Sequence, residues 1–161
     1  MFKPSAKRLC RAGVIAALYA ALTLVSAPIA FGPLQLRVAE TLTALPLLFP
    51  EAVPALAVGC AISNLLSPLG LIDVAAGSAV TLVAALLTRL CRKKPVLAML
   101  FPVLLNAALL PALWYFVGGE GAWLMNCGSV LLTQTVFCMG GGLPLYYALK
   151  KRKETSRFLQ D

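Results

Sequence analysis

The basic residues of this chain are confined almost entirely to three blocks, and each block borders a long apolar stretch. The blocks are Lys3–Arg11, Arg89–Lys94 and Lys150–Arg157, and of the 14 Lys and Arg residues only Arg37 lies outside them. Inserted membrane proteins retain Lys and Arg in the loops on their cytoplasmic side. The pattern therefore predicts an integral membrane protein with all three blocks facing the cytoplasm.

The composition agrees with this class. Hydrophobic residues make up 60% of the 161 residues and charged residues only 12%, with a mean hydropathy of +0.88, whereas soluble proteins carry about 25% charged residues. The net charge of +8 does not indicate nucleic-acid binding, because the blocks lack the interleaved aromatic and polar residues that read bases. We interpret them as cytoplasmic flanks against anionic lipid. A single membrane domain, residues 1–161, accounts for the whole length.

Several kinds of functional site have no candidate residues in the sequence. There is no histidine, and the five cysteines have no paired spacing, so we expect neither a metal site nor a disulfide framework. No Gly-rich loop ends in Lys-Ser or Lys-Thr, so the chain cannot itself cradle nucleotide phosphates. No nucleophile with its base is recognisable. We therefore predict no catalytic residue and no cofactor, and any energy-driven activity of the chain would need an energising partner.

The topology follows from the number of crossings between the blocks. Two blocks on the same side require an even number of crossings between them, so the apolar stretch 42–66 must contain two segments. Pro46, Pro50 and Pro54 supply the break, because proline interrupts helical hydrogen bonding. We predict an all-α protein of six transmembrane helices, with a short, broken second helix and cytoplasmic N- and C-termini. The predicted helices are about 9–27, 40–49, 51–67, 74–92, 96–117 and 123–149, followed by a cytoplasmic tail, 150–161.

Two local features bear on this topology. The first apolar stretch is interpreted as a span and not as a cleaved signal peptide, because Pro28 follows the possible cleavage point after Ala27. Near the other end, Gly140, Gly141 and Gly142, followed by Pro144, predict a flexible or kinked point in the last helix.

Small residues form two stripes on the first predicted helix. Gly13, Ala17 and Ala21 recur every four residues, as do Ala16 and Ala20. Such stripes let a second helix approach closely, which is how helices in lipid gain packing energy. The spacing alone leaves two interpretations open, contact within this chain and contact with a partner protein.

Polar residues collect on the outer side of the predicted topology. A charge at membrane depth costs about 2.5–3.5 kcal/mol, so such side chains usually face a partner or a wet cavity. Three acids against one arginine leave an excess of negative charge. We predict a ligand cavity open to the outside, formed from Gln35, Arg37, Glu40, Asn64, Ser67, Asp73, Glu120 and Asn126, with Asn106 and Gln134 in the fifth and sixth helices.

Each of these residues also has a plain structural alternative. Asp73 could cap the fourth helix, and Glu40 could be a first-turn acid favoured by the helix dipole and paired with Arg37. Asn64 could satisfy free carbonyls at a helix end, and Asn126 could cap the sixth helix. Convergence of polar residues from three separate loops favours the ligand cavity for the group as a whole.

A set of spaced proline, glycine and polar residues also supports a family resemblance. The set comprises Pro28–Arg37, Glu40, Leu45-Pro46, Pro50–Ala52, Gly59–Pro68, Gly70, Asp73, Gly77-Ser78 and Thr81, then Asn106-Ala107 and Gly142–Leu145. With these residues the chain resembles the QueT family. The resemblance implies an S component, the substrate-binding subunit of an ATP-driven energy-coupling factor (ECF) importer in the bacterial plasma membrane. It also implies a queuosine precursor as substrate, chiefly 7-aminomethyl-7-deazaguanine (preQ1), and no enzymatic activity.

The resemblance implies partners as well. S components dock on a transmembrane coupling subunit, EcfT, which rests on two cytoplasmic ATPase subunits, and they use small-residue stripes on the first helix to do so. It therefore favours Gly13, Ala17 and Ala21 as a docking surface, with Ala16 and Ala20 as the other register.

A deazaguanine ligand suits the predicted cavity. Its ring N–H and exocyclic amino group can donate together to one carboxylate, for which Glu40 is the first choice and Asp73 the second. We expect Arg37 to orient Glu40. The remaining expected roles are amide contacts from Gln35, Asn64 or Asn106, neutralisation of the aminomethyl cation by Asp73 or Glu120, and ring stacking on Trp114, Tyr115 or Trp123.

Three other functions remain open on the sequence. The first is an S component for another vitamin, such as riboflavin, biotin or a thiamin precursor. The second is a membrane enzyme that uses Glu40 and Asp73 as an acid–base pair. The third is a solitary facilitator or a structural membrane protein.

Overall fold

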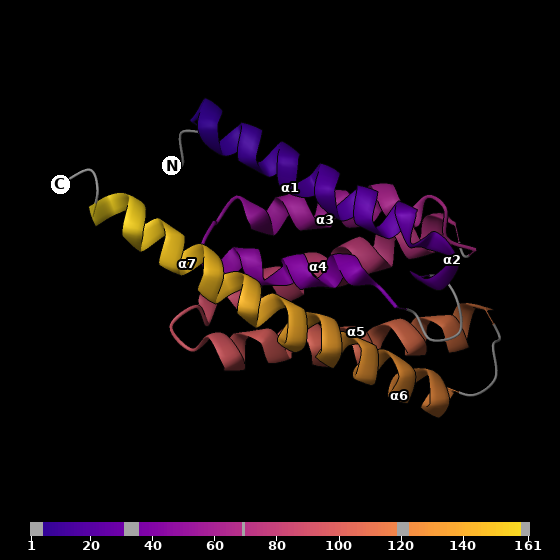
Figure 1. Ribbon diagram of the computed structural model, residues 1–161. Coiled ribbons are helices and arrows are strands. Elements are labelled where there is room, and N and C mark those ends of the chain that lie inside the picture. Colours follow the sequence, from indigo (N-terminus) through magenta and orange to yellow (C-terminus); the bar gives the residue numbers. More distant parts are fainter. Residues whose placement is uncertain (1–4, 31–35, 69, 119–122, 159–161) are drawn as a thin grey trace.

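The described residues of the computed structural model, 5–30, 36–68, 70–118 and 123–158, contain helices and no strand. The helices pack side by side in a bundle (Figure 1). The elements are α1 (Ala6–Val25), α2 (Ala27–Ala30), η1 (Val38–Leu47), α3 (Ala52–Asn64), α4 (Leu71–Leu90), α5 (Pro95–Gly118), α6 (Trp123–Gln134), η2 (Thr135–Gly142) and α7 (Leu143–Phe158).

Four helical stretches in the described residues are long and apolar enough to cross a membrane. They are Ala6–Val25, Leu71–Leu90, Pro95–Val117 and Trp123–Arg152, the last of which joins α6, η2 and the first part of α7 in one continuous helix. Val38–Leu47 and Ala52–Asn64 are also apolar but shorter. About 20 residues are needed for a straight crossing, so these two helices do not reach across a membrane by length alone.

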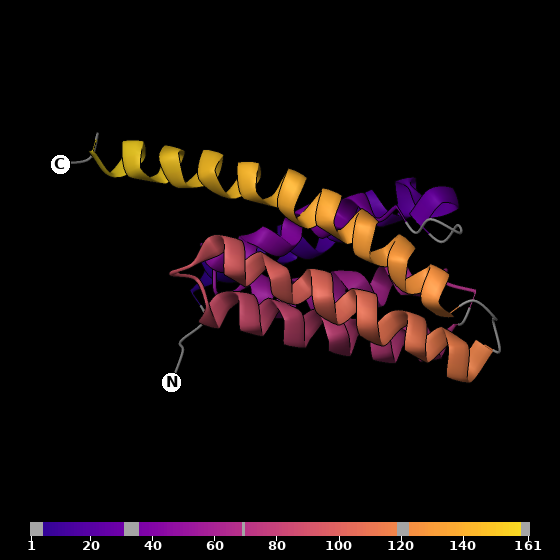
Figure 2. The same cartoon turned by 90° about the horizontal axis from the view of Figure 1, so that it is seen from below.

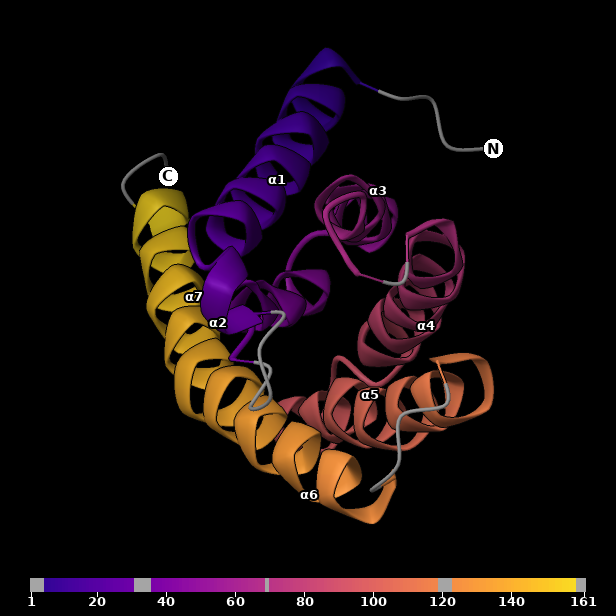
Figure 3. The same ribbon diagram turned by 90° about the vertical axis from the view of Figure 1, so that its right-hand side faces the viewer.

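The short helix η1 lies at the centre of the bundle. Figure 3 shows it end-on as a purple helix inside the ring made by the longer ones, and it contacts α1, α3, α4, α5, η2 and α7. It is a 3₁₀ helix that includes Pro46. The turn 48–51 then separates it from α3, so the apolar stretch 42–66 is divided at its prolines. Surrounding helices supply the protein environment that irregular backbone at membrane depth requires.

Close backbone contacts hold η1 and α3 in place. At Gly59 of α3, a β-carbon would lie 2.8 Å from the Ala16 carbonyl oxygen of α1. At Gly141, a β-carbon would lie 2.7 Å from the Thr41 hydroxyl of η1. Only glycine allows such an approach without displacement of a neighbour. The glycine-rich part of the last long helix, expected to be flexible or kinked, is a π-helical segment, η2, that packs on η1.

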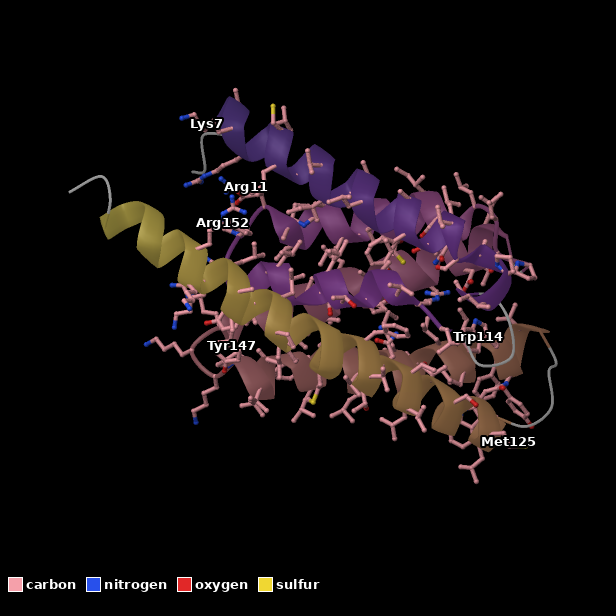
Figure 4. All side chains as sticks on the ribbon, in the orientation of Figure 1. Lys7, Arg11, Trp114, Met125, Tyr147 and Arg152 are labelled. Atoms are coloured by element: carbon pink, nitrogen blue, oxygen red, sulfur yellow. The ribbon has the colours of Figure 1, made fainter. Side chains whose placement is uncertain are left out.

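The three basic blocks come together at one end of the molecule. The start of α1, the turn between α4 and α5, and the end of α7 all lie on the left in Figure 1. The labelled side chains agree, since Lys7, Arg11 and Arg152 lie at this end and Trp114 and Met125 at the other (Figure 4). We call the first end the basic end. This placement is the one that the charge pattern predicted for loops on a shared side of the membrane.

Two arginines of the basic end bind the C-terminal end of η1 and the turn that follows it. Arg89, in the last turn of α4, donates to the carbonyl oxygens of Pro46 at 3.1 Å and Leu47 at 3.3 Å. The last carbonyls of a helix have no partner within it, so Arg89 caps η1. Arg11 of α1 forms an ion pair with Glu51 at 2.5 Å and lies over the Phe49 ring.

Candidate functional site

Buried charge is concentrated in one place in this fold. Among the described residues, the buried charged side chains are Arg37, which is 4% exposed, Glu40, 1%, and Asp73, 2%. Arg37 and Glu40 lie at the start of η1, and Asp73 lies in the first turn of α4. Burying a charge is costly unless it is paired and hydrogen-bonded, so the contacts of these three residues determine what the site can do.

Asp73 is held by side chains from three other parts of the chain. Ser67 donates to its Oδ2 atom at 2.5 Å, and the indole N–H of Trp114 faces its Oδ1 atom at 3.4 Å. The Nη2 atom of Arg37 lies 4.0 Å from Oδ2, which makes an ion pair. The carboxylate of Asp73 therefore joins η1, α4 and α5 and already has partners for both oxygens.

Glu40 is bound differently. The hydroxyl of Tyr19, a fully buried residue of α1, donates to its Oε1 atom at 2.7 Å. The amide of Gln134, at the end of α6, lies beside the same carboxylate. The other oxygen, Oε2, is buried and has no hydrogen bond of ordinary geometry within the described residues. A buried carboxylate oxygen in this condition is an acceptor that is ready for a donor from a ligand.

Asn64 supplies a second acceptor of this kind. Its Nδ2 atom donates to the backbone carbonyl of Asp73 at 2.9 Å, which ties the end of α3 to the start of α4. Its Oδ1 atom is buried and has no hydrogen-bond partner within the described residues. Asn64 thus binds a backbone carbonyl in the first turn of α4 and still presents one oxygen.

The π-helical segment η2 packs against the part of η1 that holds Glu40. The thiol of Cys138 donates to Gln134 Oε1 at 3.1 Å, and Thr43 of η1 contacts the same sulfur at 3.4 Å. Thr43 also donates to the backbone carbonyl of Glu40 at 2.6 Å. π-Helical turns are frequent at functional sites, and this one brings Gln134 and Cys138 against the helix that carries Glu40.

We call Tyr19, Arg37, Glu40, Asn64, Ser67, Asp73, Trp114 and Gln134 together the polar cluster. It lies toward the end opposite the basic end, where Figure 4 shows Trp114. Its residues come from α1, η1, the end of α3, the start of α4, α5 and α6. One arginine and two carboxylates leave it with an excess of one negative charge when all three are ionised, which favours a ligand with a positive charge or several N–H donors.

The structure brings together some of the residues predicted for the site. Arg37, Asp73 and Trp114 interact directly, and Asn64 binds the Asp73 backbone. Asn106 is buried in α5, eight residues before Trp114 and thus about 12 Å along the helix axis. Two further predicted residues, Gln35 and Glu120, lie outside the described residues.

Three of the polar residues also had an expected structural role as an ion pair, a helix cap or a first-turn acid. Arg37 was expected to pair with Glu40; it forms an ion pair with Asp73 and also lies within electrostatic range of Glu40. Asp73 is not the cap of α4, since Gly70 occupies that position with a φ of 59°. Glu40 does lie in the first turn of η1.

Residues of the small-residue stripes fall on two faces of α1. Gly13, Ala17 and Ala21 are exposed. Ala16 and Ala20 are buried, and Ala16 lies against Gly59 of α3. The second stripe therefore packs within this chain, because its residues occupy the face that α3 covers.

Sequence reasoning missed the role of Tyr19. A single tyrosine in an apolar helix forms no motif with its sequence neighbours, so nothing near Tyr19 indicates a function. Its position two residues after Ala17 offers no signal either, because its partner Glu40 lies 21 residues away along the chain.

Fold and site together define a multi-pass helical membrane protein with a buried, net-negative polar cluster. The chain belongs to the QueT transporter family, whose family model matches residues 9–151. This membership indicates a transport role. Comparisons with curated proteins and with solved structures give no match.

Proposed function

We propose that the chain is the substrate-binding S component of an ATP-driven ECF importer and that it captures preQ1 from outside the cell. Family membership supports a transport role, and the polar cluster supports a cationic, donor-rich substrate. The single observation that carries the choice is the buried Glu40, whose Oε2 atom makes no hydrogen bond of ordinary geometry within the described residues. The substrate, rather than the protein, supplies the missing donor.

The proposed binding mode assigns different tasks to the two carboxylates. Glu40 Oε2 accepts from the ring N–H or exocyclic amino group of the deazaguanine, while Tyr19 fixes Oε1. Asn64 Oδ1 accepts a further donor. Asp73 is already bound to Ser67, Trp114 and Arg37, so its main contribution is negative charge that offsets the aminomethyl cation.

The proposed topology has six crossings in the bacterial plasma membrane, with both termini and the tail 150–161 in the cytoplasm. The shared location of the three basic blocks supports it, and η1 and α3 count as the second and third segments within one membrane domain, residues 1–161. In this orientation the polar cluster belongs to the outer half of the membrane, toward the side from which substrate arrives.

The proposed partners are the coupling subunit EcfT and two cytoplasmic ATPases. The exposed stripe of Gly13, Ala17 and Ala21 on α1 is the proposed docking surface. Ala16 and Ala20 are left out of it because they are buried against the rest of the chain. The same helix carries Tyr19 toward the polar cluster, so docking and substrate binding use two sides of one element.

Isothermal titration calorimetry of the detergent-purified chain tests the substrate. We expect preQ1 to bind more tightly than preQ0, its nitrile precursor, because preQ0 lacks the positive charge that offsets the cluster. Queuine and riboflavin complete the panel. Binding of riboflavin without binding of any deazaguanine would reject the substrate assignment in favour of another vitamin.

Two conservative variants test the site. Glu40→Gln and Asp73→Asn should each weaken preQ1 binding by roughly 10- to 100-fold, because a hydrogen bond to a charged group contributes about 1.5–3 kcal/mol. Glu51→Gln is the matched control, since Glu51 is a carboxylate at the basic end, where it pairs with Arg11. Unchanged affinity in both cluster variants, with folded protein, would remove the polar cluster as the binding site.

A further inference from the structure

A surface groove at the basic end lies apart from the polar cluster. It runs between the first turns of α5 and the α7 helix and has a volume of about 480 Å³. This lies within the range of about 300–1,000 Å³ that small-molecule sites occupy. The residues that line it are Lys94, Pro95, Val96, Leu97, Leu100 and Tyr147.

The groove exists because α7 diverges from α5 toward the basic end. Figure 2 shows the yellow helix leaving the bundle on the side where the rose helix begins. Leu100 lies three residues after Leu97 and four after Val96 on α5, so its side chain neighbours both on the helix surface. All three are exposed, so none of the described helices covers them.

Lys94 places a positive charge at the edge of the groove, whereas the side chains along its floor are apolar. Lys94 is exposed and immediately precedes α5, and the first hydrogen bond of that helix runs from the Ala98 amide to the Lys94 carbonyl at 2.9 Å. The amides of Val96 and Leu97 precede it and have no acceptor within the helix. A helix N-terminus beside a lysine favours a phosphate group.

Tyr147 forms the other side of the groove. Its side chain is 52% exposed, and Figure 4 places it near the basic end. Tyrosine is enriched where the apolar and polar parts of a membrane meet. Lys151 lies one helical turn beyond it on the same face of α7. The groove therefore changes from apolar to cationic along its length, as a phospholipid changes from acyl chain to headgroup.

We propose that this groove binds one anionic phospholipid of the leaflet at the basic end. The phosphate binds Lys94 and the first amides of α5, and one acyl chain lies along Val96, Leu97 and Leu100 beside Tyr147. Basic pockets between transmembrane helices on the cytoplasmic side suit anionic headgroups. The proposal concerns a different surface from the polar cluster and does not depend on the identity of the transported substrate.

Native mass spectrometry of the full chain, released from vesicles of equal phosphatidylglycerol and phosphatidylcholine, tests the proposal. We expect wild-type protein to retain phosphatidylglycerol preferentially, in the absence of preQ1 or any partner subunit. Lys94→Gln should lower this preference about tenfold, since it removes a charged donor to the phosphate. Lys93→Gln is the matched control: it removes the same charge from the adjacent residue, which does not line the groove, and should change the preference by less than about twofold.

A second pair of variants tests the apolar part. Leu97→Trp fills the groove and should abolish lipid retention, whereas Leu104→Trp, at an exposed position of the same helix outside the groove, should not. Val96→Trp replaces Leu97→Trp if the latter fails to fold, and an unchanged thermal unfolding temperature in detergent reports the fold of each variant.

Three results would overturn the proposal. Equal loss in the Lys93 and Lys94 variants would indicate diffuse attraction to the membrane surface. Full competition by inorganic phosphate would indicate an anion site without a lipid. Retention of lipid by Leu97→Trp, together with failure to assemble with the coupling subunit, would make the groove a protein interface.

Discussion

Gly77 is the position at which a single methyl group should disturb the polar cluster without removing any of its polar atoms. It lies on the buried face of α4, and a β-carbon built there would be 2.5 Å from Nδ2 of Asn64. Ordinary van der Waals contact begins at 3.4 Å, so the Asn64 amide must move by about 0.9 Å in Gly77→Ala. That displacement breaks the 2.9 Å hydrogen bond from Asn64 to the Asp73 carbonyl.

The expected magnitude follows from the lost contacts. A buried hydrogen bond whose partner is left unsatisfied costs about 1–3 kcal/mol, and alanine returns up to about 1 kcal/mol through its better helix propensity. The free energy of unfolding should therefore fall by about 0–2 kcal/mol. Substrate affinity should fall by about tenfold, because the Oδ1 acceptor of Asn64 moves with the amide and about 1.4 kcal/mol corresponds to a factor of ten.

The assay combines calorimetry with preQ1 and thermal unfolding in detergent. Gly128→Ala is the matched control, because Gly128 is also helical but a β-carbon there meets nothing within 4 Å. The control should bind preQ1 normally and unfold at the same or a slightly higher temperature. Wild-type affinity in Gly77→Ala would refute the reasoning, since it would mean that Asn64 and the start of α4 take no part in the site.

Three further predictions concern α1. Tyr19→Phe removes the hydrogen bond to Glu40 and should weaken preQ1 binding about tenfold; calorimetry showing no change would mean that Tyr19 only fills space. Arg11→Glu and Glu51→Arg should each lower the free energy of unfolding by about 0.5–1 kcal/mol, and the double exchange should restore it; additive losses would show that the pair is not coupled. Ala17→Trp should prevent co-purification with the coupling subunit and leave preQ1 affinity unchanged, and a normal complex would place docking elsewhere.

The arrangement of the basic blocks could be predicted from the sequence because it rests on a rule about the membrane. Lys and Arg remain on one side of the bilayer whatever the helices between them do, so the charge pattern limited the topology before any packing was known. The division of 42–66 followed from proline chemistry, which is local. The same reasoning predicted a short second helix over about 40–49 but gave no means of deciding that it is a 3₁₀ helix.

The site could be predicted only as a set of residues and not as a set of contacts. Polar residues in apolar sequence stand out singly, which is why Arg37, Glu40 and Asp73 were recognised. Their partners depend on tertiary structure. Arg37 forms an ion pair with Asp73 on another helix, far along the chain, and Tyr19 had no sequence signal for its contact with Glu40.

The most direct test of the account is a crystal structure of the chain with preQ1 bound. The account predicts the deazaguanine ring within the polar cluster, with a ring or amino nitrogen at hydrogen-bond distance from Glu40 Oε2 and the aminomethyl group on the side of Asp73. A preQ1 molecule bound outside the cluster, with no ligand atom at hydrogen-bond distance from Glu40, would contradict it.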